Sequence, residues 1–171
     1  RDFCLSRGLG DVYKRQEKAS LEIESIDDPV TAILIRTKDK KIMSRTFKLI
    51  YDILAADKNG KEPMMNILAW YGLERPKEFF RNFEAELQDV PLRYHCMIFL
   101  RSKHRPDCYY AEGDEQILIS PAIAEMNGIF PVAREEDLPK LTPEKIYEIR
   151  REVSMSKEEF EKVIKCIKAA L

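Results

Sequence analysis

The stretch that decides the fold class is RYHCMIFL, residues 93–100, which closely follows Pro91. Its side chains are aromatic, β-branched or sulfur-containing, and the spacing of apolar residues changes here from a period of about 3.6 to a period of 2. A period of 2 is typical of a strand, so the stretch is predicted to be one. Helical patterns before it and strand patterns around it predict an α+β protein with a small antiparallel sheet.

Three helices are predicted between residues 44 and 89, because apolar residues recur there at helical spacing and are bounded by capping, proline and glycine signals. They cover residues 44–59, 63–72 and 76–89, with Ser44 as the N-cap of the first. Two strands are predicted before them, at residues 21–25 and 30–37, separated by the turn Asp27-Asp28-Pro29.

Beyond residue 100 the sequence predicts a polar, basic loop and then two more short strands, at residues 108–111 and 116–119. Ser120-Pro121 predicts a short helix that stops at Asn127-Gly128, and residues 129–141 are expected to be an extended connection. Two amphipathic helices follow, at 143–153 and 157–170, capped by Thr142 and by Ser156 with Glu159. These two helices form a predicted C-terminal pair over residues 142–171.

The order helix, helix, helix, strand, basic loop, strand over residues 44–111 resembles a winged helix-turn-helix. Residues 68–73, LAWYGL, keep the alanine, the glycine and the apolar follower that this family places in its second helix, with Ala69 and Gly72 three positions apart. The resemblance implies a winged-helix-like core at residues 44–120 of a single domain at 17–171. It also implies that DNA is a partner and that the basic loop is the wing.

Five basic residues are the candidate nucleic-acid-binding residues: Lys77, Arg81, Arg101, Lys103 and Arg105. The last three lie on the predicted wing, where they could reach phosphates, and the first two lie on the third predicted helix. The expected partner is double-stranded DNA or an acidic protein. A mobility shift of duplex DNA at low salt would test this prediction. Basic residues also cluster at 36–48, and the hypothesis is favoured if both clusters share one face.

The alternative prediction is a non-catalytic interaction or assembly protein that forms a homodimer through helices 143–153 and 157–170. The second of these helices carries an apolar stripe that could pack on the domain or on another copy. The stripe consists of Phe160, Val163, Ile164, Ile167 and Leu171. The pair Trp70-Tyr71 could also mark an exposed aromatic patch for a partner protein.

No catalytic motif is found, so the chain is predicted not to be an enzyme and to need no cofactor and no metal. Cys96, His104 and Cys108 are the only cysteine and histidine grouping, and they lack the close pairs typical of zinc sites. Carboxylates follow Pro106-Asp107, but the lysine expected in a nuclease site is missing. Gly-x-Ser-x-Gly and phosphate-binding glycine loops are also missing outside residues 1–16.

Composition sets the remaining expectations. With 44% hydrophobic and 35% charged residues, the chain should be globular, and its net charge of −1 argues against indiscriminate binding to polyanions. Its apolar runs are far shorter than the roughly 20 residues of a membrane span. Widely spaced cysteines indicate a reducing, cytoplasmic location. Residues 1–16 resemble translated sequencing-adapter read-through and are expected to be a non-native leader that packs on nothing.

Overall fold

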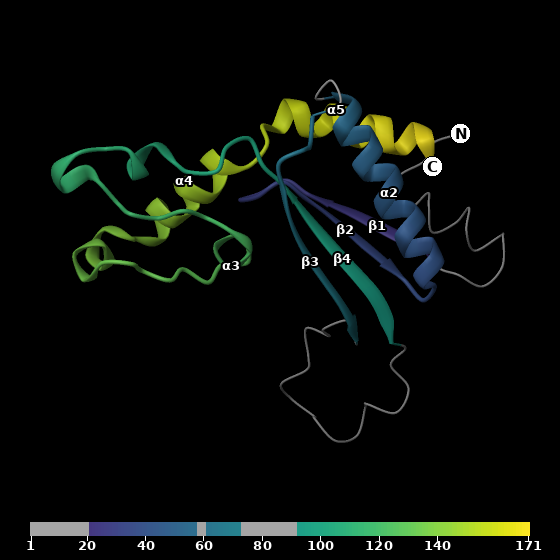
Figure 1. The fold of residues 1–171 in the computed structure, drawn as a ribbon, viewed down its shortest axis with the longest axis horizontal. Helices are drawn as coiled ribbons and strands as arrows, with labels where there is room; N and C mark the ends of the chain where they lie inside the picture. The colour runs from purple at the N-terminus through teal and green to yellow at the C-terminus, as the bar shows by residue number, and fades with distance from the viewer. Residues whose placement is uncertain (1–20, 58–60, 73–91) are drawn as a thin grey trace, which may run out of the picture.

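The computed structural model describes residues 21–57, 61–72 and 92–171, and within them it confirms the α+β class (Figure 1). Its strands are β1 (Glu22–Ile26), β2 (Ala32–Thr37), β3 (Met65–Gly72) and β4 (Arg93–Leu100). Its α-helices are α2 (Lys40–Asp57), α3 (Ile123–Met126), α4 (Pro143–Val153) and α5 (Lys157–Ala170). Three short 3-10 helices lie between β4 and α4: η1 (Asp107–Tyr109), η2 (Gly113–Glu115) and η3 (Glu135–Lys140).

The strands form one antiparallel sheet in the order β1-β2-β4-β3. The stretch RYHCMIFL is β4, an interior strand that pairs with β2 on one side and with β3 on the other. The strand prediction for this stretch is therefore confirmed. Its interior position explains its apolar character, because β4 lies between two strands and its side chains are buried in clusters on both faces of the sheet.

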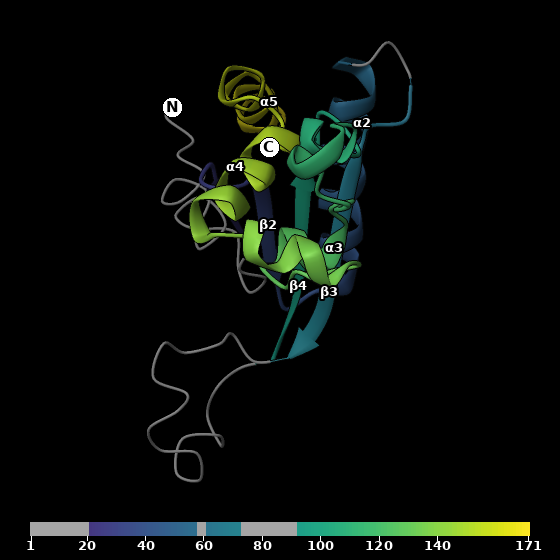
Figure 2. The same cartoon turned by 90° about the vertical axis from the view of Figure 1, so that its left-hand side faces the viewer.

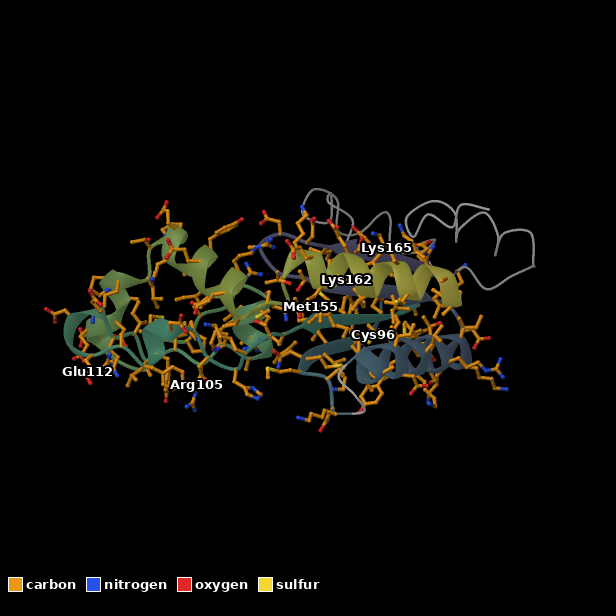
Figure 3. The ribbon with its side chains drawn as sticks, turned by 90° about the horizontal axis from the view of Figure 1, so that it is seen from above. Cys96, Arg105, Glu112, Met155, Lys162 and Lys165 are labelled. Atoms are coloured by element: carbon orange, nitrogen blue, oxygen red, sulfur yellow. The ribbon has the colours of Figure 1, made fainter. Side chains whose placement is uncertain are left out.

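Helices α2 and α5 lie side by side and cover one face of the sheet (Figures 1 and 3). The main core forms between them and the inward side chains of the strands. Its members include Ile33, Ile35, Cys96 and Ile98 from the sheet, Ile50 and Leu54 from α2, and Phe160, Val163, Ile164 and Ile167 from α5. The apolar stripe of α5 is thus buried within the chain, so it is not an uncommitted surface of the kind that motivated the dimer prediction.

The predicted helix N-caps Thr142 and Ser156 are confirmed, and the predicted N-cap Ser44 is not. Helices α4 and α5 begin where the sequence predicted, because Thr142 Oγ1 accepts a hydrogen bond from Lys145 N at 3.2 Å and Ser156 Oγ accepts one from Glu159 N at 3.3 Å. The prediction of Ser44 as the N-cap of the first helix was wrong. Helix α2 begins one turn earlier, where Asp39 Oδ1 accepts a hydrogen bond from Lys41 N at 2.6 Å.

The helix predicted at residues 63–72 was also wrong, because residues 65–72 form strand β3. The sequence MNILAWYG is apolar at nearly every position, so it fits a period of 3.6 and a period of 2 equally well. Pairing with β4 over eight residues decides between the two. The helix, helix, helix order on which the winged-helix resemblance rests is therefore not the observed order. The third predicted helix, 76–89, lies outside the described residues, as does the predicted leader, 1–16.

The two strands predicted after the basic loop are not formed. Residues 107–109 form η1, and residues 116–119 have no regular secondary structure and no ladder partner in the described chain. Ile117 N donates one hydrogen bond to Cys108 O at 3.0 Å, but no second rung follows. Ile117 and Ile119 are instead buried against Ile149 of α4, which explains their apolar character.

Residues 101–153, called the arm here, run from the end of β4 through α3 and α4 and extend to one side of the sheet (Figure 1). They include the short predicted helix, which begins at Ile123 rather than at Pro121. The arm returns to the sheet at its end, where Met155 N donates a hydrogen bond to Leu100 O at 2.9 Å. None of the helices in the described part of the chain has the length and apolar character that a bilayer crossing requires.

Candidate functional site

The candidate site lies on the sheet face opposite α2 and α5. Because side chains alternate along a strand, Cys96 and Ile98 face the main core while His95, Met97 and Phe99 face the other way. The register of β3 on β4 places Trp70 beside His95 and Leu68 beside Met97 on this second face. Helix α3 lies over part of this face (Figure 2), and its Met126 packs on Phe99 in a second buried cluster.

A pocket of about 710 Å³ opens between this face and α3. It is lined mainly by apolar side chains from β3, β4 and the α3 segment: Leu68, Trp70, Gly72, Met97, Ile123, Ala124, Asn127 and Ile129. A concave, mostly apolar site of this size is typical of small-molecule binding sites, which usually measure about 300–1,000 Å³. Asn127 adds an amide at the rim, where its Nδ2 donates to Ile123 O at 2.7 Å.

Trp70 is held in a fixed position within the pocket wall. Its ring is stacked on the imidazole of His95, with centroids 4.6 Å apart and planes only 3° from parallel. His95 is buried, and its Nε2 lies 3.3 Å from Gly72 O. Trp70 itself remains 38% exposed. An immobilised indole with an accessible surface can stack on a flat ligand without first losing rotamer freedom.

A row of side chains crosses all four strands beside this stack. The register places Glu22 opposite Arg36, Arg36 opposite His95, and His95 opposite Trp70. The charges in this row are paired, since Arg36 Nη2 lies 2.8 Å from Glu24 Oε2 and Arg93 Nη1 lies 2.5 Å from Glu22 Oε1. The pocket therefore has an aromatic and apolar end next to a charge-balanced surface.

Arg101, at the start of the arm, links β3 to the segment that precedes α3. Its Nη1 donates to Asn66 Oδ1 of β3 at 2.6 Å and to Pro121 O, just before α3, at 2.8 Å. Its Nη2 donates to Lys103 O and His104 O, and its Nε donates to Val153 O. All five N–H groups of the guanidinium thus have an acceptor. The side chain is only 5% exposed, and burial lowers the pKa of Arg101.

A second buried charge, Asp137, organises the far part of the arm. Its carboxylate is 1% exposed, lies 2.8 Å from Arg134 Nη2 and accepts a hydrogen bond from Leu118 N at 3.0 Å. The hydrogen bonds from Arg134, ahead of the other contacts, lower the pKa of Asp137 from 3.8 to about 2. The segment at 116–119 is thereby fixed through its backbone, without a strand partner in the described chain.

We expect Asp137→Asn to lower stability at neutral pH and to lose this effect in acid. A lowered carboxyl pKa stabilises the fold above the unfolded-state value of 3.8, and the contribution disappears as the pH falls toward about 2. Urea unfolding at a series of pH values measures the difference between the two proteins. Glu136→Gln is the control, because Glu136 is 67% exposed on the same turn. An equal loss for both variants at neutral pH would contradict the role given to Asp137.

Three of the predicted DNA-binding residues lie in the described part of the chain, and all three make contacts within the chain. Arg101 has no guanidinium N–H left for a phosphate, and Lys103 is paired with Asp107 and Glu152. Arg105 is half-buried, with its guanidinium 4.2 Å from the centre of the Tyr109 ring. Lys77 and Arg81 lie outside the described residues. DNA binding through these residues stays a prediction.

The two basic clusters lie at opposite ends of β4. Arg36 and Thr37 pair with His95 and Tyr94 near the start of this strand, whereas Arg101 follows its end. Figure 3 agrees with this separation, since Arg105 is labelled on the arm, whereas α2, which contains residues 40–48, lies beside α5 on the other side of the molecule. Residues 36–48 and 101–105 therefore do not share one face, which was the arrangement that would have favoured a single phosphate-binding surface.

The pocket was not predicted, because the sequence of residues 63–72 favoured a helix. The pair Trp70-Tyr71 was predicted to mark an exposed aromatic patch, but the sequence does not place Trp70 beside His95. The site could have been predicted from the alternation of Asn66, Leu68 and Trp70. These three side chains lie on one face if the segment is a strand. For metals, the described residues contain no cluster of three or more histidine, cysteine or acidic side chains that could hold an ion.

Residues 96–171 match the family model described as GDPGP1-like, C-terminal domain. The matched part contains most of β4, the whole arm and α5, and hence the pocket wall formed by Met97 and the α3 segment, but not β3. No curated protein and no solved structure matches this chain.

Proposed function

We propose that the protein binds a small molecule with a flat, largely apolar part in the pocket between the sheet and α3. The observation that carries the proposal is the combination of a pocket of about 710 Å³ with a Trp70 ring that His95 holds in place. A bicyclic aromatic group would stack on Trp70 and contact Leu68 and Met97. The amide of Asn127 at the rim would select for a polar substituent.

The proposal includes two expectations from the sequence. The protein is a binding protein and not an enzyme, so turnover of a bound compound would contradict it. It works in a reducing compartment, the cytoplasm, which fits the three free cysteines of the described residues, Cys96, Cys108 and Cys166. Burial raises the pKa of the Cys96 thiol to about 11, so this side chain acts as a small apolar core residue.

Trp70 makes the test specific, because it is the only tryptophan of the chain. A ¹H–¹⁵N spectrum therefore contains a single indole N–H signal, and it comes from the pocket wall. We expect 2-naphthol and indole to shift this signal in a saturable way, and phenol to bind several-fold more weakly because it covers less apolar area. An indole signal that stays in place up to millimolar concentrations of all three compounds would overturn the proposal.

A pair of matched variants locates the binding. Ile129 lines the pocket and is 69% exposed, whereas Leu138 on η3 is 61% exposed and is not a lining residue. Ile129→Ser should weaken 2-naphthol binding by about 3- to 10-fold, the usual effect of losing one aliphatic contact. Leu138→Ser should leave the affinity unchanged. Equal effects of the two substitutions would contradict binding at this pocket.

A further inference from the structure

Strand β3 is an edge strand with an unusual composition. It pairs with β4 on one side, and no described strand pairs with its other side. Its sequence MNILAWYG contains no charged residue and no proline, although these are the residues that commonly protect sheet edges from pairing with other chains. Large apolar side chains are exposed on both faces: Ile67 by 44%, Leu68 by 36%, Trp70 by 38% and Tyr71 by 57%.

The hydrogen-bond pattern shows which backbone groups of β3 point outward. Arg101 N donates to Met64 O at 3.0 Å, so these two residues form a hydrogen-bonded pair of the antiparallel ladder. Such pairs alternate with non-hydrogen-bonded ones, so the even-numbered residues of β3 direct their N–H and C=O groups toward β4. The odd-numbered residues direct theirs away from the sheet. These are Met65, Ile67, Ala69 and Tyr71.

We propose that this edge pairs antiparallel with β3 of a second copy of the chain, which joins the two sheets into one. Outward-pointing residues must pair with outward-pointing residues, so the register that pairs all four of them places Ile67 opposite Ala69 of the other copy and Met65 opposite Tyr71. The two-fold axis then passes at Leu68, which faces its own equivalent. This interface is isologous, because each copy contributes the same strand.

A second copy is the occupant that fits the edge. An uncharged strand meets its own copy without like-charge repulsion, and four outward residues in each chain supply a complete set of donors and acceptors. Covering the exposed parts of the strand would remove roughly 400–500 Å² per chain from water, which is below the about 800 Å² per chain of a standard stable interface. We therefore expect a weak dimer in rapid exchange, separate from the C-terminal helices, whose apolar stripe is buried.

Sedimentation velocity of the full chain tests the pairing. The average mass should rise from one chain toward two between about 10 µM and 1 mM, the range expected for an interface of this size. Ala69→Pro should abolish the rise, because proline removes an N–H that points outward and spares the ladder with β4. Ala69→Ser is the control and should dimerise like the unaltered chain. A one-chain mass at all concentrations, or equal dimerisation of both variants, would overturn the proposal.

A cysteine pair tests the register. In a chain with Cys4→Ser and Cys166→Ser, Leu68→Cys places two thiols across the axis in a non-hydrogen-bonded pair, where Cα atoms are about 4.5 Å apart and a disulfide can form. Mild oxidation should therefore give a disulfide-linked dimer. Ala69→Cys should not, because residue 69 faces residue 67 of the other copy. Equal cross-linking of the two variants would overturn the register, and a chain that sediments only as a monomer would overturn the pairing while leaving the pocket proposal intact.

Discussion

Arg101→Met is expected to lower the free energy of unfolding by about 3–5 kcal/mol, since it removes the donor from five buried or part-buried hydrogen bonds. The acceptor oxygens belong to Asn66, Lys103, His104, Pro121 and Val153, which come from β3, the first loop of the arm, the segment just before α3 and the end of α4. Methionine fills the space of the aliphatic stem but donates no hydrogen bond. Urea unfolding followed by circular dichroism measures the loss.

Two further substitutions show whether the geometry of the guanidinium is responsible. Arg101→Lys keeps the charge but has three donors at one point, so it should recover only a minor part of the loss. Arg45→Met on the exposed surface of α2 removes the same side chain where the structure shows no such acceptors, and it should change stability by less than about 0.5 kcal/mol. If Arg101→Met costs no more than Arg45→Met, the role given to Arg101 is wrong.

The same side chain shows why the sequence alone was misleading about the wing. Arg101 begins the run RSKHRP, which has the composition of a solvated basic loop. Its burial arises only because the arm folds back and Val153, Pro121 and Asn66 meet around the end of β4. These residues are up to 52 positions away from Arg101 in the chain. A local pattern contains no information on such a meeting, so a structural arginine and a phosphate-binding arginine have the same local signature.

Elements with strong local signals were predictable. Helices α4 and α5 have a capping residue followed by an apolar stripe, and both the caps and the buried stripes are found. β4 was predictable because its β-branched, aromatic and sulfur side chains favour a strand. β3 was not, because six apolar residues among eight satisfy both periods, and only its pairing with β4 selects the strand. Residues 116–119 were wrongly predicted to form a strand. Their apolar side chains are buried, but the segment pairs with no strand of the described chain.

The candidate site depended on the element that was misassigned. The pocket needs Trp70 and Leu68 on one face of a strand, and it needs the register that brings them to His95 and Met97. With residues 63–72 predicted to be helical, no reasoning from spacing could join Trp70 to His95, which is 25 residues later in the sequence. Once β3 is known to be a strand, the alternation rule alone places these side chains together.

Ile167→Asp is expected to destabilise the protein by about 4 kcal/mol or more, because it places a carboxylate in the core between α5, α2 and the sheet. Ile167 is fully buried there, with an exposed fraction of 0%. Cys166→Asp is the matched control on the exposed side of the same helix turn, and it should cost under about 1 kcal/mol. Urea unfolding at two well-separated protein concentrations measures both variants.

A stripe buried within one chain predicts the same loss at both concentrations. If the C-terminal helices instead formed a dimer interface, Ile167→Asp would leave the unfolding of the isolated chain unchanged and remove only its dependence on concentration, and that result would contradict the core assigned to α5.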